Sequence, residues 1–223
     1  MDLPINKLYS QDYDVLRKNM VEKQIERRGV SDKNVLKAML KVERHLFVPQ
    51  EYIESAYDDN PLPIGEGQTI SQPFIVAYMT ELLNLDSTKN VLEIGTGSGY
   101  QAAILAEIAG NVYSIELIKS LSDKAKKVLD MLNYQNIKLK VGDGYLGWKE
   151  YSPFDAIIVT CAPTHIPKML KDQLAEGGII IIPVGEAYSQ EIVILKKEKG
   201  KLLKKETIGV RFVPMKDEKG NTY

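Results

Sequence analysis

Cysteine is almost absent from this sequence, which holds one, Cys161, among 223 residues. A single cysteine excludes an internal disulfide and any metal site built from a cysteine cluster. Long apolar runs are also missing, since none approaches the roughly 20 residues that a membrane span needs. The N-terminal residues lack the basic and apolar regions of a signal peptide. We therefore expect a cytoplasmic protein without a membrane partner and without a bound metal.

Excess charge of either sign is absent as well. The formal net charge is −1, so no overall field attracts nucleic acid. Residues 12–29 have helical apolar spacing, and we interpret the basic cluster Lys23, Arg27 and Arg28 as the solvated face of this helix, which Gly29 would end. A nucleic-acid patch at these residues is the weaker alternative. The length suits one α/β domain with a terminal extension.

The segment before residue 60 offers few functional groups. Ser31 is the expected N-cap of a second helix. His45 lies in the run RHLFVP, residues 44–49, at a helix-to-loop junction. A histidine in such a place is more often structural than a general base. We expect residues 1 to about 60 to form a helical extension.

The most informative motif is VLEIGTGSGY, residues 91–100. A short strand pattern, glycines at alternate positions and a helical pattern follow one another, which is the context of a nucleotide site. Glycine lets a ligand approach the backbone without meeting a Cβ. The third glycine comes one place earlier than in the dinucleotide fingerprint G-x-G-x-x-G. Glu93 would repel a pyrophosphate and suits a cationic ligand, so the pattern favours S-adenosylmethionine over NAD(P).

Two further acids follow predicted strands. Glu116 ends the strand 112–115 and lies 21 positions after Gly95, from where a carboxylate can reach a ribose hydroxyl pair. Because NAD and S-adenosylmethionine both contain adenosine, Glu116 supports both equally. Asp143 stands between glycines at the end of the third strand and can accept from an adenine amino group. A plain turn would explain Asp143 equally well.

Residues 65–73, GEGQTISQP, crowd glycines, amides and hydroxyls ahead of an apolar helix over 74–83. Pro73 suits the first turn of that helix, and Ser71 is placed near its N-cap. Capping would explain the serine. It would not explain why so many hydrogen-bonding groups precede the glycine motif.

The C-terminal part departs from the strand–helix repeat. Residues 190–197 and 202–213 flank Lys199-Gly200 and read as an antiparallel hairpin. A doubly wound parallel sheet that ends in such a hairpin is typical of class I methyltransferases, whereas nucleotide-binding dehydrogenases usually continue parallel. The N/D-P-P-Y tetrapeptide of many amine methyltransferases is absent at 160–163, which argues against nucleobase substrates.

Taken together, the motifs resemble the protein-L-isoaspartate O-methyltransferase (protein-beta-aspartate methyltransferase) family from Arg17 to about Met215. The most specific element is GQTISQP, residues 67–73, before the glycine motif. The others are RHLFVP at 44–49, GDG at 142–144, EGG at 176–178 and VRFVP at 210–214. The resemblance implies a class I, Rossmann-like α/β fold: one domain over 1–215 and a polar tail over 216–223.

The resemblance also implies the reaction. The methyl group of S-adenosylmethionine would pass to the free α-carboxylate of an L-isoaspartyl residue in a damaged protein or peptide, and the ester would close to a succinimide. A carboxylate with a pKa near ~3.5 is already ionised at neutral pH, so no general base is needed. Alignment within about 3–3.5 Å is the main requirement. This fits a sequence without a convincing His–acid pair.

Site roles follow from the resemblance and from residue chemistry. Ser71 would orient the substrate carboxylate and serve as the catalytic residue, with Phe74 shaping the mouth of the acceptor site. The remaining residues would hold the cofactor: Thr69, Ile70 and Ser71 over it, Glu93, Gly95, Thr96, Gly97 and Ser98 at its methionine part, Glu116 at the ribose, and Asp143 and Gly144 near the adenine.

Three alternatives stay open at this point. The chain could methylate another carboxylate or small molecule, act as an NAD(P)-dependent oxidoreductase, or keep the fold as a non-catalytic nucleotide-binding module. The early third glycine, Glu93 and the terminal hairpin disfavour NAD(P). The intact Gln-Thr-Ile-Ser run at 68–71 disfavours a non-catalytic module. The oligomeric state is left open.

Overall fold

The computed structural model describes residues 12–186 and 189–222. A 7-stranded sheet forms the middle layer, in the order β5-β4-β3-β6-β7-β8-β9. Pairing is parallel from β5 to β7 and antiparallel from β7 to β9. The strands are β3 (Asn90–Ile94), β4 (Asn111–Glu116), β5 (Ile137–Val141), β6 (Phe154–Val159), β7 (Leu174–Glu186), β8 (Ser189–Glu198) and β9 (Lys201–Val210). The class I methyltransferase-like α/β fold expected from the sequence is confirmed.

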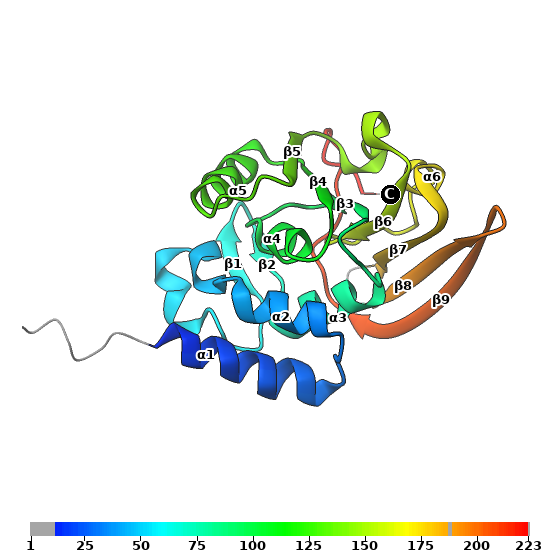
Figure 1. Cartoon of the computed structure of the whole chain (residues 1–223). Coiled ribbons are helices and arrows are strands. Elements are labelled where there is room, and N and C mark those ends of the chain that lie inside the picture. The colour runs from blue at the N-terminus through cyan, green and yellow to red at the C-terminus, as the bar shows by residue number, and fades with distance from the viewer. Residues whose placement is uncertain (1–11, 187–188, 223) are drawn as a thin grey trace, which may run out of the picture.

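The central strands are buried on both faces because helices cover the sheet from both sides (Figure 1). Strand β6 illustrates this, since Ile157 and Ile158 point to opposite faces and both are fully buried. The strand order reverses between β3 and β6, so β4 and β6 both neighbour β3. In open α/β sheets ligands bind at the carboxyl ends of the strands at such a switch point.

Helices α3 (Pro73–Leu82), α4 (Tyr100–Ala106) and α5 (Lys119–Met131) pack into one core cluster, together with an N-terminal helical layer. Helix α6 (Lys168–Asp172) contributes Leu170 to a second cluster on the other face of the sheet. Short 3₁₀ helices connect these elements: Arg44–Phe47, Gln50–Ser55, Gly144–Leu146 and Lys149–Tyr151.

The N-terminal layer lies below the sheet in Figure 1. Helix α1 (Tyr13–Asn19) continues as a π-helix over Met20–Ile25 and a 3₁₀ turn over Glu26–Arg28, and Gly29 ends it at φ +99°. Helix α2 (Lys33–Lys41) begins one residue later than expected. Its N-cap is Asp32, whose Oδ1 accepts from two backbone N–H groups at 2.9 Å, so the prediction for Ser31 is wrong. The first eleven residues of the predicted extension lie outside the described residues.

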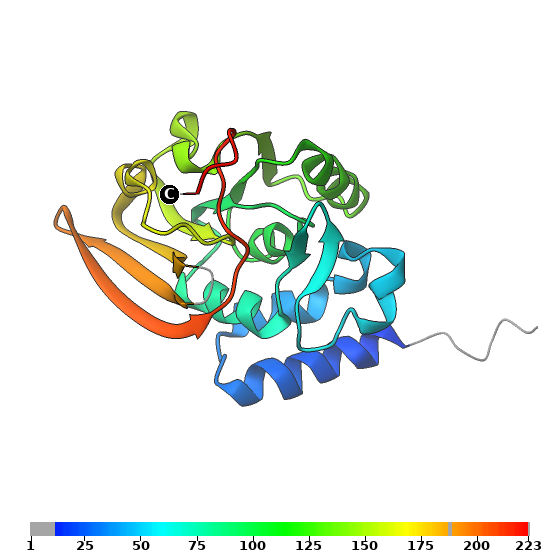
Figure 2. The ribbon, with the colours of Figure 1, turned by 180° about the vertical axis from the view of Figure 1, so that it is seen from behind.

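Two features differ from the expected pattern around the loop at 65–73. Residues expected to form a loop instead make a small hairpin of β1 (Leu62–Gly65) and β2 (Gln68–Ile70), joined at Glu66 and Gly67, which both have positive φ. This is the cyan hairpin in front of the sheet in Figure 2. Helix α3 then starts at Pro73 with Gln72 as its N-cap and no side-chain capping bond. Ser71 is therefore not a capping residue.

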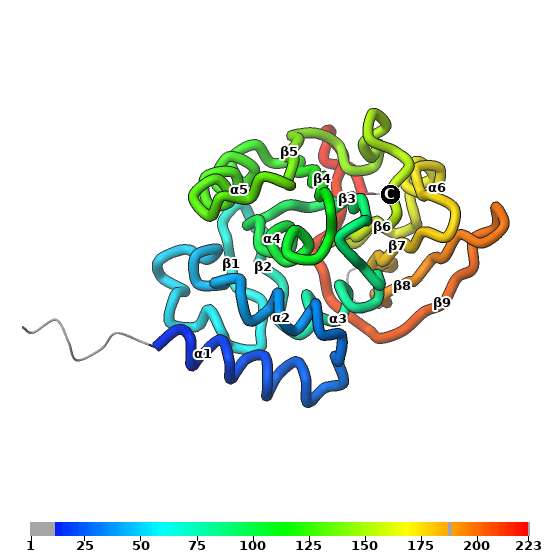
Figure 3. The backbone as a smooth tube through the Cα atoms, viewed as in Figure 1, coloured from blue at the N-terminus to red at the C-terminus, as the bar shows by residue number. Residues whose placement is uncertain are grey.

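The terminal hairpin is confirmed, with β8 and β9 joined by a turn at Lys199 and Gly200 in the left-handed region. After β9 the chain returns across the carboxyl ends of the parallel strands, as the backbone tube of Figure 3 traces. Pro214 bridges to Ala162, and Met215 is buried there. Among the residues described, no helix combines the length and the apolar character required to cross a bilayer.

Candidate active site

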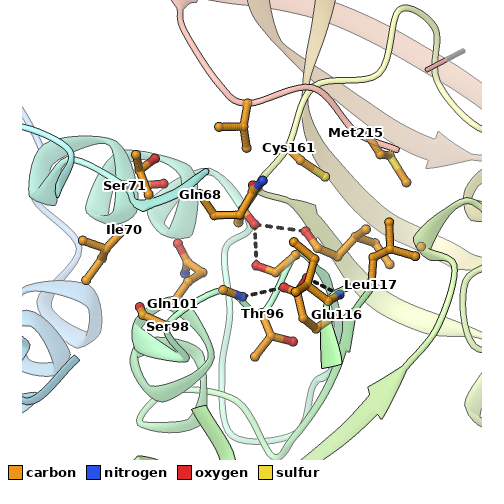
Figure 4. Close-up of a pocket in the computed structure, with 18 of the residues that line it drawn as sticks. Gln68, Ile70, Ser71, Thr96, Ser98, Gln101, Glu116, Leu117, Cys161 and Met215 are labelled. Atoms are coloured by element: carbon orange, nitrogen blue, oxygen red, sulfur yellow. Dashed lines mark hydrogen bonds between the residues drawn. The ribbon is translucent and has the colours of Figure 1, made fainter. Parts of the chain in front are cut away.

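A cavity opens at the carboxyl ends of β3 and β4, which we call the inner cavity. Its walls come from the β2 strand and the segment after it, the glycine turn, the end of β4 and the returning C-terminal segment. The lining residues are 68–71, 94–98, 115–118 and 213–216, with Val76, Tyr100, Gln101, Gly144, Thr160 and Cys161. Figure 4 shows Gln68 and Ser71 on one side of this cavity and Glu116 and Met215 on the other.

The glycine turn is held in a conformation that other residues rarely adopt. Gly95 has φ +96°, and its N–H donates to Ile115 O at 2.8 Å. A Cβ on Gly95 would lie 2.6 Å from Thr160 Oγ1, which donates to Gly95 O at 2.7 Å. Gly97 also has a positive φ. The turn therefore requires glycine both for its backbone angles and for its close contact with Thr160.

Glu116 connects the second strand to the glycine turn. Its Oε2 accepts from Gly97 N at 2.8 Å and its Oε1 from Ile118 N at 2.9 Å, as Figure 4 shows for the residues drawn. The side chain is buried and lines the inner cavity. A carboxylate has about four acceptor positions, so two backbone bonds leave capacity for ligand hydroxyls. Glu116 therefore lies at the end of the second parallel strand and lines the inner cavity, and its contact with a ribose stays a prediction.

Glu93 occupies a different position from the one expected. Its side chain is fully buried on the face of β3 that also carries Val91, and it does not line the inner cavity. Oε2 accepts from Ser114 Oγ, which lies 2.6 Å from Thr96 Oγ1, while Oε1 has no partner among the described residues. Burial raises the pKa of Glu93 to about 8, and the charge of Glu116 adds to this.

Of the two residues predicted near the adenine, Gly144 lines the inner cavity and Asp143 does not. Gly144 lines the inner cavity and packs closely against Ile94 and Met215, so that a Cβ would lie 2.3 Å from Ile94 Cγ2. Asp143 is not in the lining, and its Oδ1 accepts from Tyr145 N at 2.8 Å to cap a 3₁₀ turn. Asp143 therefore lies next to the cavity wall and not on it.

The segment Thr69–Ser71 lies over the inner cavity as expected, and all three residues line it. Ile70 is buried and Ser71 is partly buried. The Ser71 hydroxyl has no hydrogen-bond partner within the part of the chain that the structure describes. It is therefore available to a ligand.

A second cavity, which we call the outer cavity, has a volume of about 670 Å³ and borders the inner one. Its lining consists of Arg28, Pro61, Thr69, Ser71, Gln72, Phe74, Ile75, Thr160, 189–191 and 208–213. Phe74 belongs to this cavity and not to the inner one. Four residues line both cavities: Thr69, Ser71, Thr160 and Val213. The predicted catalytic serine therefore stands where the two spaces meet.

Several lining residues were not predicted from the sequence. Gln101 is fixed by a bond from its Nε2 to Thr80 Oγ1 at 2.9 Å. Thr160 directly follows β6, and Met215 and Lys216 belong to the segment predicted as the end of the domain and a polar tail. Only the position of Thr160 after a buried strand gave a usable signal. The tail contacts the site because the chain returns across the sheet.

Two other candidates have no catalytic geometry. His45 stacks on Tyr13 with ring centroids 4.0 Å apart, and its Nδ1 lies 2.8 Å from Tyr57 Oη, outside both cavities. Cys161 lines the inner cavity, but desolvation raises the pKa of its thiol and keeps it protonated at neutral pH. Within the described residues no group of three His, Cys, Asp or Glu side chains is arranged to hold a metal ion.

Comparison with known proteins gives one consistent result. A Geobacter metallireducens protein-L-isoaspartate O-methyltransferase is 53% identical over 205 residues, which cover 92% of this chain and 95% of the relative. The Dictyoglomus thermophilum enzyme of that name is 49% identical over 98% of this chain and 99% of its own length. These relatives extend over nearly the whole chain.

Solved structures agree with the sequence relatives. A Plasmodium falciparum structure, described as a protein-L-isoaspartate O-methyltransferase in complex with S-adenosyl-L-homocysteine, has a TM-score of 0.79 at 28% identity and covers 92% of this chain and 99% of that one. Another protein-L-isoaspartate O-methyltransferase structure has a TM-score of 0.84 at 31% identity and covers 92% of this chain and 67% of that one. The family model for protein-L-isoaspartate(D-aspartate) O-methyltransferase matches residues 15–220, and the chain belongs to this family.

Proposed function

We propose that this chain transfers the methyl group of S-adenosylmethionine to the free α-carboxylate of L-isoaspartyl residues in proteins and peptides. The resulting ester would close to a succinimide, whose hydrolysis returns some normal aspartate. The observation that carries this proposal is the meeting of two cavities at Ser71. A donor in the inner cavity and a carboxylate in the outer cavity would face each other there.

The residues of the inner cavity suit S-adenosylmethionine. Glu116 would receive the ribose hydroxyls on the acceptor positions that Gly97 and Ile118 leave free. The backbone over 95–98 would hold the methionine part, and Gly144 would allow the adenine to approach closely. The Glu93 side chain lies behind the cavity wall and would not contact the ammonium group. It would orient the Thr96 hydroxyl toward that group through the hydroxyl of Ser114.

The chemistry of the step requires little beyond positioning. The donor supplies a methyl group on a positively charged sulfur, and a carboxylate oxygen bonds to that carbon while the carbon–sulfur electron pair returns to sulfur. Ser71 would donate its unpaired hydroxyl to the second carboxylate oxygen. Thr69 and Ile70 would exclude water, which otherwise solvates the carboxylate and lowers its reactivity.

The decisive experiment supplies methyl-labelled S-adenosylmethionine with an isoaspartyl peptide and with its normal aspartyl twin. We expect base-labile label on the isoaspartyl peptide alone, because a carboxyl methyl ester hydrolyses in base. Equal labelling of both peptides, or label that survives base, would contradict the proposed substrate. The net charge of −1 gives no reason to expect a nucleic-acid or membrane partner, and we place the activity in the cytoplasm.

A further inference from the structure

Arg28 brings a positive charge into the outer cavity. It stands at the end of the N-terminal helical segment, far in sequence from Ser71, yet its side chain lines the same cavity. The side chain is 43% exposed, so the guanidinium remains accessible to a ligand. From the sequence we expected the basic cluster that contains Arg28 to be only a solvated helix face. That expectation does not explain why Arg28 lines the outer cavity.

Two contacts fix the orientation of the guanidinium. Its Nη1 donates to Asp59 Oδ2 at 2.7 Å, and its Cζ lies 3.5 Å from the centroid of the Phe74 ring. The Phe74 ring in turn stacks on Tyr78 with centroids 5.6 Å apart. Among the described residues Arg28 donates no other hydrogen bond that would occupy its remaining N–H groups. An arginine carries five N–H donors, so most of them are free for a carboxylate.

The ion pair with Asp59 does not neutralise this region. Asp59 also acts electrostatically on Arg44, which is fully buried. Burial lowers the pKa of Arg44 to about 10, so it stays a cation at neutral pH. Asp59 forms its ion pair with Arg28 at 2.7 Å, and the positive charge of Arg44 lies close enough to Asp59 to interact with the same carboxylate. Arg28 is the arginine of this pair that lines the outer cavity. The other ionisable lining residues are Glu191 and Arg211.

Arg28 and Asp59 are also connected to the segment that carries Ser71. Gln72, which follows Ser71 directly, donates from Nε2 to Asp59 O at 3.0 Å. Phe74 follows two residues later, and the guanidinium of Arg28 stacks on its ring. A substrate group bound by Arg28 would therefore be held in a fixed position relative to Ser71.

We propose that Arg28 is a specificity-determining residue that selects isoaspartyl segments with an acidic side chain close to the isoaspartyl residue. The inference rests on the proposed function, because it assigns part of the outer cavity to the chain that flanks the methylated carboxylate. Arg28 would bind the flanking carboxylate with the N–H groups that Asp59 leaves free. The interaction is charge-assisted but partly exposed, which corresponds to roughly a 3–10-fold preference.

The test uses a set of isoaspartyl peptides in which one flanking residue is Glu, Gln or Lys. The position of this residue is varied from two residues before the isoaspartyl residue to three residues after it. For each enzyme we compare kcat/KM of the Glu and Gln peptides at every position. This ratio cancels any general loss of activity or folding in a variant. We expect the wild type to prefer Glu over Gln at one or two positions and to discriminate most against Lys.

Three variants separate the explanations. Arg28→Gln should reduce the preference for Glu to less than 2-fold, while Arg28→Lys should keep part of it. Arg27→Gln is the matched control, because Arg27 is the exposed neighbour on the same turn and lines neither cavity; it should leave the preference unchanged. The inference would be overturned if the wild type showed no preference for Glu over Gln, or if the preference persisted in Arg28→Gln.

Failure of the inference and failure of the proposed function give different results. If the isoaspartyl peptides are methylated but the variants leave the Glu-to-Gln ratio unaltered, only the role of Arg28 is refuted. If no isoaspartyl peptide is methylated in preference to its aspartyl twin, the proposed function fails first. An equal loss of kcat/KM for all peptides in Arg28→Gln counts against specificity, since it would show a role in packing Phe74 alone.

Discussion

The two cavities that meet at Ser71 are built in different ways. The inner cavity takes most of its walls from consecutive strand ends, the glycine turn and the start of the next helix, between residues 94 and 161. The outer cavity combines residue 28, residues 61–75 and the ends of the terminal hairpin. A site for a constant ligand can be specified by local backbone geometry. A site for variable peptides here depends on tertiary contacts between distant segments.

The largest effect is expected where the inner cavity depends most strongly on backbone geometry. In Gly95→Ala the new Cβ would meet Thr160 Oγ1 at 2.6 Å, and φ of +96° would be strained. We expect a loss of about 3–5 kcal/mol in stability and cofactor affinity combined. Urea unfolding and calorimetric binding of S-adenosylhomocysteine measure the two parts.

Gly177→Ala is the control for this prediction. Gly177 also has a positive φ, +78°, but no atom lies within 4 Å of the position of its Cβ, and it lines neither cavity. Its cost should be limited to about 1–2 kcal/mol of backbone strain, with unchanged cofactor affinity. If both variants behave alike, the contact with Thr160 contributes nothing to the inner cavity.

The second prediction concerns the buried carboxyl group behind the glycine turn. The pKa of Glu93 is raised from its ordinary value of 4.5 to about 8, so the native state binds its proton more tightly than the unfolded state. Stability from this group is present below pH 4.5 and is lost as the pH rises to about 8. Glu93→Gln removes the titration. As the pH rises from 5 to 9, the free energy of unfolding of the wild type should therefore fall by roughly 2–4 kcal/mol more than that of the variant.

Urea unfolding of both proteins at these two pH values measures the difference. Parallel pH profiles would show that Glu93 titrates normally and that its burial in the structure does not persist in solution. Cofactor affinity of Glu93→Gln should change less than that of a variant at Glu116, because Glu93 does not line the inner cavity.

Glu93 also marks the limit of what the sequence could predict. From its place before the first glycine we expected the Glu93 carboxylate to face a cationic ligand, but its side chain lies behind the cavity wall. The acid expected at the end of the second strand, Glu116, does lie there. The direction of the Glu93 side chain was not predictable, because β3 is buried on both faces and has no polar alternation to reveal its orientation.

Tertiary contacts account for the other differences. Ser31 and Asp32 are both good capping residues. In the structure the Ser31 hydroxyl and the backbone N–H of both residues donate to Glu81, which is distant in sequence, and it is the Asp32 side chain that caps the helix. The outer cavity was missed because Arg28 and Phe74 are brought together by the fold and not by spacing. Local patterns therefore predicted the sheet and the inner cavity, while contacts between distant segments set the rest.

The third prediction tests the ribose contact. Glu116→Ala should weaken S-adenosylhomocysteine binding by about 1–3 kcal/mol, because it leaves Gly97 N and Ile118 N without their acceptor and the ribose hydroxyls without a partner. Asp123→Ala on α5 is the control, since it removes only an exposed ion pair with Lys119. Calorimetric titration compares the two. An unchanged affinity in Glu116→Ala would refute the assigned role.

The smallest effect is expected at Ser71, where the two cavities meet. Its hydroxyl has no partner among the described residues and does not cap α3, so its removal leaves no broken bond within the protein. Ser71→Ala should raise the activation free energy for an isoaspartyl peptide by about 1–2 kcal/mol, which lowers kcat roughly 5–30-fold, because the substrate carboxylate loses one donor and its alignment. Affinity for S-adenosylhomocysteine should stay within about twofold. If kcat and cofactor affinity fall equally, Ser71 belongs to the inner cavity alone, and the contrast between a donor space and an acceptor space that share this residue no longer holds.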